Sequence, residues 1–160
     1  MISKILASIY EKCNFQITNF VKDNESEEYD ACAFKLDNKN IIYRSSKITP
    51  KKVGQFVTFW KRNKEGITKP FSENSLLDFY VINVQSENKT GQFVFPKAVL
   101  IEKGIISTSK KDGKRAFRVY SIWDKTTNKQ AEKSQKWQLN YFFEVNKELD
   151  LDFVKRLYSK

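Results

Sequence analysis

Apolar residues recur along the chain at two spacings, one typical of helices and one typical of strands, and together they predict a mixed fold. Residues 2–13 have the helical spacing, so we expect an amphipathic helix there. Residues 29–36 and 40–47 are typical of strands, and the turn-forming residues 37–39 between them indicate a hairpin. The charged residues 22–28 are expected to connect the helix to this hairpin.

The middle of the chain contains one stretch that fits both spacings. Thr49-Pro50 is an N-cap residue followed by proline at the first helical position, and apolar residues continue at helical spacing to Trp60. The same residues also alternate as a strand does. We expect a helix over 50–60, with a strand as the alternative. Residues 77–84 and 92–95 then predict the two strands of a second hairpin.

The last third of the chain predicts three helices and one more pair of strands. The expected elements are helices over 97–103, 128–145 and 150–158 and strands over 105–107 and 116–120, which flank a basic turn. The whole pattern predicts an α+β fold, with a central mixed or mostly antiparallel sheet and flanking helices. We expect residues 1–160 to form a single domain.

Composition supports a folded, water-soluble chain. Of the 160 residues, 40% are hydrophobic and 14% are aromatic, whereas disordered chains are poor in aromatic residues. The longest apolar runs have four or five residues, far fewer than the roughly 20 that cross a bilayer. The first residues lead into no apolar signal region. We therefore expect a cytoplasmic protein with no membrane partner.

The available side chains exclude several kinds of catalysis. The chain has no histidine, so it has no Ser-His-Asp or Cys-His nucleophile pair and no imidazole metal ligand. Cys13 and Cys32 are far apart and form no CxxC pair, so we expect both to be buried. Neither a GxGxxG nor a GxxxxGK[ST] motif occurs. We expect no cofactor, and any catalysis would use carboxylates and lysines, with or without a divalent metal.

Positive charge is concentrated in two separate windows of the sequence. The chain has 29 Lys+Arg against 19 Asp+Glu, a formal net charge of +10. Residues 41–72 hold 8 basic and 1 acidic residue, and residues 101–140 hold 10 basic and 4 acidic residues. We call these the first and second basic windows. Such clustering is typical of a polyanion-binding face, because Lys and Arg that contact phosphates release condensed counterions. A solvated, lysine-rich surface is the alternative interpretation.

The basic windows supply all the candidate binding residues except Lys97, which lies between the windows. Four of the five arginines lie in these windows, and guanidinium suits bidentate contact with phosphate or guanine. Trp123 follows a predicted strand end and could be exposed as a stacking platform, whereas Trp60 and Trp137 are expected in the core. The candidate nucleic-acid-binding residues are Arg44, Lys47, Lys51, Lys52, Lys61, Arg62, Lys97, Lys114, Arg115, Arg118 and Trp123.

We further expect the two basic windows to form one surface. A sheet brings distant segments together, so Arg44, Lys61 and Arg62 are expected beside Lys114, Arg115 and Arg118. The alternative for Arg118 is a structural ion pair with Asp78 or Asp124.

A metal-dependent nuclease is the alternative function. Nucleases of the PD-(D/E)xK type place a carboxylate on one strand and an acidic-x-Lys pair on the next. The chain has three acidic-x-Lys triplets, which is about the number expected by chance, and all lie in predicted turns: residues 37–39, 87–89 and 112–114. The strand that would partner Asp78 has no acid and no lysine before Lys97. We therefore expect DNA or RNA binding, with DNA preferred, and no catalytic or metal-ligating residue. A degenerate nuclease using Asp78 and Glu73 remains the alternative.

Four blocks of the sequence resemble the MepB family in the identity and order of their residues: residues 43–62, 91–97, 114–120 and 135–138. The resemblance implies a bacterial protein sometimes encoded alongside a multidrug efflux pump and its repressor. It also implies a fold similar to nucleases of the restriction-endonuclease type and a capacity to bind nucleic acid. A protein-interaction or small-molecule module tied to drug resistance would fit that context, but it would leave the clustered charge unexplained.

Overall fold

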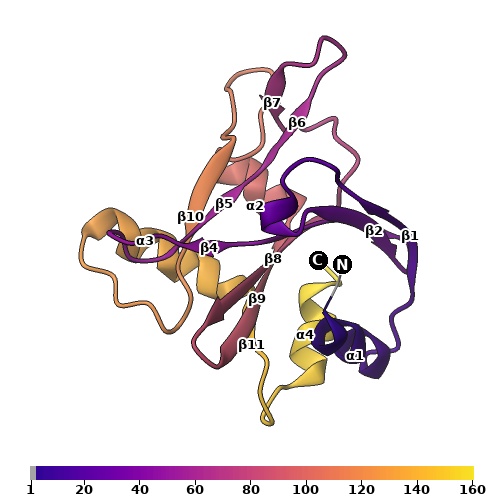
Figure 1. The fold of residues 1–160 in the computed structure, drawn as a ribbon, viewed down its shortest axis with the longest axis vertical. Coiled ribbons are helices and arrows are strands. Elements are labelled where there is room, and N and C mark those ends of the chain that lie inside the picture. Colours follow the sequence, from indigo (N-terminus) through magenta and orange to yellow (C-terminus); the bar gives the residue numbers. More distant parts are fainter. Residues whose placement is uncertain (1–2) are drawn as a thin grey trace.

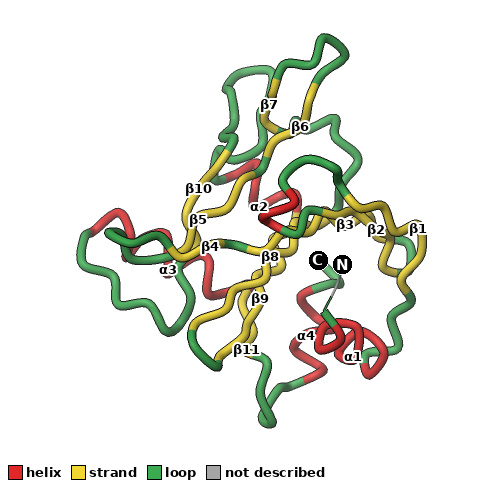
Figure 2. The backbone as a smooth tube through the Cα atoms, in the orientation of Figure 1, coloured by secondary structure: helices red, strands yellow, loops and turns green. Residues whose placement is uncertain are grey.

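A six-stranded mixed sheet runs through the centre of the computed structural model, which describes residues 3–160 (Figures 1 and 2). Its strands, in spatial order, are β1 (Ile17–Lys22), β2 (Cys32–Leu36), β3 (Lys39–Ser45), β8 (Phe79–Ser86), β9 (Lys89–Pro96) and β11 (Phe142–Glu144). Neighbouring strands are antiparallel except β3 and β8, which are parallel. Helices pack on the sheet, so the fold is α+β with a central mixed sheet, as the sequence predicts.

The β8–β9 hairpin is buried on both faces. Its side chains alternate between two cores, with Phe79 and Val81 in one and Tyr80 and Ile82 in the other. Burial on both faces requires a nearly continuous apolar run, which is the pattern that made this hairpin recognisable in the sequence.

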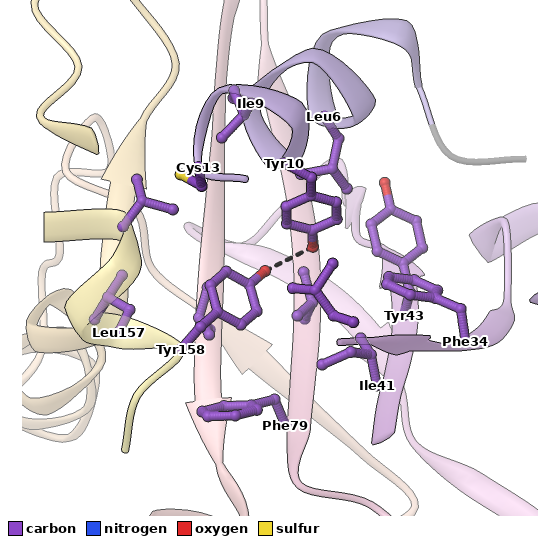
Figure 3. Close-up of a cluster of buried hydrophobic side chains, with 14 of the residues drawn as sticks. Leu6, Ile9, Tyr10, Cys13, Phe34, Ile41, Tyr43, Phe79, Leu157 and Tyr158 are labelled. Atoms are coloured by element: carbon purple, nitrogen blue, oxygen red, sulfur yellow. Dashed lines mark hydrogen bonds between the residues drawn. The ribbon is translucent and has the colours of Figure 1, made fainter. Parts of the chain in front are cut away.

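Two helices cover one face of the sheet, α1 (Lys4–Lys12) and α4 (Leu151–Leu157). Each helix begins at a capping side chain, Ser3 or Asp150, that accepts a hydrogen bond from a backbone N–H in the first turn. Between the helices and the sheet, the hydroxyls of Tyr10 and Tyr158 share a buried hydrogen bond of 2.6 Å between oxygens (Figure 3). This bond joins the first helix to the last.

Shorter elements cover the other face. A second sheet consists of β4 (Lys47–Ile48), β5 (Gln55–Thr58) and β10 (Ala116–Val119), and a small hairpin consists of β6 (Trp60–Arg62) and β7 (Thr68–Pro70). The helical elements are α2 (Lys97–Glu102), α3 (Lys129–Gln138) and the two short 3-10 turns η1 (Glu27–Tyr29) and η2 (Leu139–Tyr141). The second core lies between these elements and the central sheet, where Phe59 stacks on Tyr80 with 4.1 Å between ring centroids.

The helix predicted over 50–60 is wrong. Pro50 lies in a turn, and residues 55–58 form the strand β5, which pairs with β4 on one side and β10 on the other. Alternating burial along β5 matches the strand alternative that the sequence also allowed. Residues 55–58 form a strand despite their helical spacing, because β10, which comes about 60 residues later in the chain, pairs with them.

Two further differences concern the last third of the chain. The long helix predicted to Val145 ends at Gln138, and residues 142–144 form β11, which pairs with the exposed edge of β9. The predicted pairing of 105–107 with 116–120 is also wrong, because β10 pairs with β5 instead. The edge strand β1 was not predicted, since its side chains are mostly exposed and show no apolar alternation.

The remaining predicted elements are confirmed within one to three residues, namely the first and last helices, both hairpins and α2. Residue 2, where the first helix is predicted to begin, lies outside the described residues. Cys13 and Cys32 are both buried, as expected, and burial raises the pKa of the Cys32 thiol to about 12. Among residues 3–160, no helix has the length and apolar character needed to cross a membrane.

Candidate nucleic-acid interface

A groove of about 890 Å³ lies on the face that carries the second sheet. Its walls come from the β4–β5 loop, the end of α2, the loop that follows it, strand β10 and helix α3. Both basic windows therefore contribute to one groove, although the β4–β5 loop and α3 are separated by more than 70 residues.

Buried polar side chains hold the walls of the groove together. The Gln138 side chain, which is 2% exposed, bridges α3 to the end of β10. Its Oε1 accepts a hydrogen bond from the Tyr120 N–H at 2.8 Å, and its Nε2 donates to the Arg118 carbonyl at 3.0 Å. Asn128 caps α3 by accepting a hydrogen bond from the Ala131 N–H. These contacts fix α3 at a set distance from β10.

Away from α3, the wall of the groove depends on a close approach between residues 105–107, which follow α2, and residues 113–114, which precede β10. The Gly113 N–H donates to Ser107 Oγ at 2.7 Å, and the Lys114 N–H donates to the Ile105 carbonyl at 2.9 Å. A Cβ at Gly113 would collide with the Ile105 carbonyl. Glycine is therefore required where this basic loop folds back on the end of α2.

The groove is strongly cationic. One acidic residue, Glu102, lines it, against seven basic residues: Lys51, Lys52, Lys103, Lys111, Lys114, Arg118 and Lys133. Within residues 3–160, none of these seven cations lies within salt-bridge distance of a carboxylate. Unneutralised charge of one sign in a concave site focuses the field and attracts polyanions.

Four predicted binding residues line this groove: Lys51, Lys52, Lys114 and Arg118. The ion pair that the sequence suggested for Arg118 is not formed. Instead, its guanidinium donates to the Val53 and Gly54 carbonyls and to Thr49 Oγ1, which ties β10 to the β4–β5 loop. The two proposed partners have other roles, because Asp78 accepts from the Asn40 N–H and Asp124 accepts from the Ser121 N–H.

Three other predicted residues, Arg44, Lys61 and Arg62, line a separate cavity of about 500 Å³. They do not lie beside Lys114, Arg115 and Arg118 as predicted, so the two windows converge only in part. Arg44 is 2% exposed and donates from Nη1 to Thr58 Oγ1 and from Nη2 to the Trp60 carbonyl. A guanidinium buried in this way joins β3 to the β5–β6 segment and does not reach a surface phosphate.

The last four predicted residues lie outside both cavities, and each makes its own contact. Lys47 pairs with Glu28, and Lys97 donates to the Ser75 carbonyl at 2.7 Å. Arg115 donates to the Thr68 carbonyl, which joins β10 to β7.

Trp123 is half-buried and does not stand free as a stacking platform. Its Nε1 donates to Glu144 Oε1 at 2.7 Å, and its ring packs edge-on against Phe142. The hydrogen bond from Trp123 lowers the pKa of the Glu144 carboxyl.

Sequence reasoning missed three of the seven groove cations and one aromatic residue of the groove. Lys103, Lys111 and Lys133 lie in the second basic window, but nothing in their spacing separated them from the other lysines. Trp137 was assigned to the core, and it does pack on Phe95, yet it is half-buried and lines the groove.

The carboxylates show a different arrangement from the cations. The three acidic-x-Lys triplets lie in turns or loops and outside strand interiors, although Lys39 and Lys89 are the first residues of β3 and β9. The Asp78 carboxylate accepts the Asn40 N–H at 2.7 Å, so it organises the start of β3. In the described part of the chain, no three Cys, Asp or Glu side chains come together as a metal site would require.

Comparison with known proteins places the chain in a family. The model of the MepB-like family matches residues 23–144. The chain belongs to the MepB-like family. The crystal structure of MepB is 34% identical, has a TM-score of 0.81, and covers 92% of this chain and all of that one. The MepB-like match includes every residue that lines the groove and leaves α1 and α4 outside it.

Two other comparisons complete the picture. The structure of a bacterial homing endonuclease is similar at 16% identity and a TM-score of 0.46, covering 84% of each chain. A search of the curated proteins finds no significant match.

Proposed function

We propose that this MepB-like protein binds nucleic acid, with DNA preferred over RNA, along the groove between the β4–β5 loop, β10 and α3. The observation that supports the proposal is the convergence of seven cations from both basic windows on one groove that one carboxylate lines. Each window alone offers too few cations for strong binding at physiological salt, whereas the groove combines them.

The groove favours contact with phosphates over the reading of bases. Two of its amide side chains, Asn128 and Gln138, are already engaged by backbone groups. The lysines that remain are point charges suited to phosphate, and phosphate contacts carry no sequence information. Binding is therefore expected to tolerate many sequences.

Salt dependence tests the proposal. If four to seven cations contact phosphates, the slope of log K against log salt should be roughly −4 to −6 on duplex DNA. Fluorescence anisotropy with labelled duplex DNA, single-stranded DNA and RNA, between 50 and 300 mM salt, measures that slope and ranks the three ligands. An affinity that does not change with salt would contradict the proposal.

A matched pair of charge reversals locates the site. Lys51→Glu/Lys52→Glu removes two groove cations and should reduce the slope by roughly 1.8, on all sequences alike. Lys147→Glu/Lys160→Glu changes the net charge equally at exposed positions outside the groove. Equal losses in the two variants would mean that net charge alone drives binding.

We propose binding without cleavage, because the Asp78 carboxylate is held by the Asn40 N–H and strand β9, the antiparallel partner of β8, contains no acidic-x-Lys pair. Plasmid DNA should stay intact for hours with Mg²⁺ or Mn²⁺. Metal-dependent nicking that disappears in Asp78→Asn would instead establish the nuclease alternative.

A further inference from the structure

An acidic segment neutralises part of the first basic window. Among residues 3–160, the acidic partner of every salt bridge lies in residues 23–28, which we call the acidic segment. It pairs Asp23 with Arg44, Glu25 with Arg62 and Glu28 with Lys47, at 3.9, 2.6 and 3.9 Å between nitrogen and oxygen. All three cations belong to the first basic window, and none lines the groove. The acidic segment therefore occupies cations that the sequence assigned to nucleic acid.

The acidic segment is held by charge more than by packing. It runs from the end of β1 into η1 and lies beside the β6–β7 hairpin, as the contact with Arg62 requires (Figure 1). The side chains of Glu25 and Glu28 are 45% and 65% exposed. Ser26 is in the left-handed backbone region, with φ of 55°, which costs free energy in a residue other than glycine. Exposed ion pairs contribute little stability, so the segment can be displaced.

The cations beneath the segment are themselves suited to phosphate. The Arg62 guanidinium lies 5.3 Å from the centre of the Trp60 ring, and the Lys47 ammonium lies 4.8 Å from the centre of the Tyr29 ring. A cation–π contact holds each cation in place without neutralising its charge, so each one still attracts phosphate. Lys47 also begins β4, which leads directly into the loop that carries Lys51 at the groove.

We propose that the acidic segment is an internal competitor for nucleic acid. When a strand bound in the groove extends along β4, its phosphates displace Glu25 from Arg62 and Glu28 from Lys47, which adds two cationic contacts. Asp23 stays with the buried Arg44. The proposal rests on the nucleic-acid binding proposed for the groove, and the experiment below separates the two.

Neutralising the segment tests the competition. Glu25→Gln/Glu28→Gln frees both cations, while Glu11→Gln/Glu148→Gln raises the net charge equally at exposed acids outside the segment that form no salt bridge within the described residues. Each exposed ion pair holds its cation by a factor of about 1.4 to 5, so the first variant should bind DNA at least about twofold more tightly than wild type. The gain should shrink as salt rises, because salt screens the exposed ion pairs that DNA must break in wild type.

Removing the freed cations completes the test. Adding Lys47→Gln/Arg62→Gln to the neutralised segment should abolish the gain. Equal gains in the control variant, or a gain that survives without Lys47 and Arg62, would overturn the proposal. If Lys51→Glu/Lys52→Glu weakens binding and the segment variants behave like wild type, only the internal competitor fails. If the groove variant leaves binding unchanged, the proposed function fails.

A second readout does not depend on the stability of the variants. Asn24 is exposed, and both native cysteines are buried, so a fluorophore can be attached selectively to Asn24→Cys. Saturating DNA should change the emission of the label as the acidic segment leaves Arg62. Unchanged emission at saturation would overturn the proposal.

Discussion

The bridge made by Gln138 predicts a measurable loss of stability that reaches the groove. Gln138→Leu keeps the apolar part of a side chain that is 2% exposed and removes both of its hydrogen bonds. The Tyr120 N–H and the Arg118 carbonyl then lose their partners, and each unsatisfied buried group costs about 1–3 kcal/mol. Both residues are half-buried, so water recovers part of that cost. We expect a loss of about 2–3 kcal/mol, which lowers the melting temperature by about 5–10 °C in a domain of this size.

Urea unfolding followed by circular dichroism measures this loss. The midpoint should fall with an unchanged m-value, because the surface exposed on unfolding stays the same. Gln130→Leu is the matched control for stability, since Gln130 is an exposed residue on the same helix. DNA affinity of Gln138→Leu, measured well below its melting temperature, should also fall, because β10 and α3 are no longer held together. A loss of stability below about 0.5 kcal/mol, the range of ordinary surface changes, would refute the reasoning.

Three further predictions concern the core and the basic loop. Tyr158→Phe should lower the free energy of unfolding by about 1–2 kcal/mol, because it leaves the Tyr10 hydroxyl buried without a partner. A double-mutant cycle with Tyr10→Phe, measured by urea unfolding, should show coupling between the two changes. Strict additivity would contradict the shared bond. Burial raises the pKa of five tyrosines, and most strongly that of Tyr10, Tyr43, Tyr80 and Tyr158. The folded protein therefore keeps protons on these four that the unfolded chain releases above pH 10, so stability is fully present below that pH and should fall by about 5 kcal/mol by pH 11. A constant urea midpoint from pH 8 to 11 would contradict this. Gly113→Ala should weaken DNA binding severalfold by pushing the basic loop away from Ile105, and an affinity equal to that of wild type in anisotropy would argue against the groove.

Short-range patterns were sufficient for the elements whose burial is decided locally. Helix α1 has its apolar residues at helical spacing behind the capping Ser3, and the β8–β9 hairpin is an apolar run broken by a polar turn. Residues 55–58 show where this reasoning stops. Their side chains satisfied both periods, and the choice was made by β10, a strand partner distant in sequence. Likewise, residues 142–144 leave the helical pattern because the edge of β9 is open to them.

The sequence by itself determined the fold class, the family resemblance, the lack of histidine chemistry and the existence of two basic windows. It could not assign each cation to a partner, because a lysine or arginine looks the same whether it faces solvent, a carbonyl or a carboxylate. Tertiary structure decided that Lys51 and Lys114 share a groove, that Arg44 is buried beneath Trp60 and that Arg62 is held by Glu25. The physical reason is range: helical and strand periods act over a few residues, whereas the field of a binding site sums charges that only the folded chain brings together.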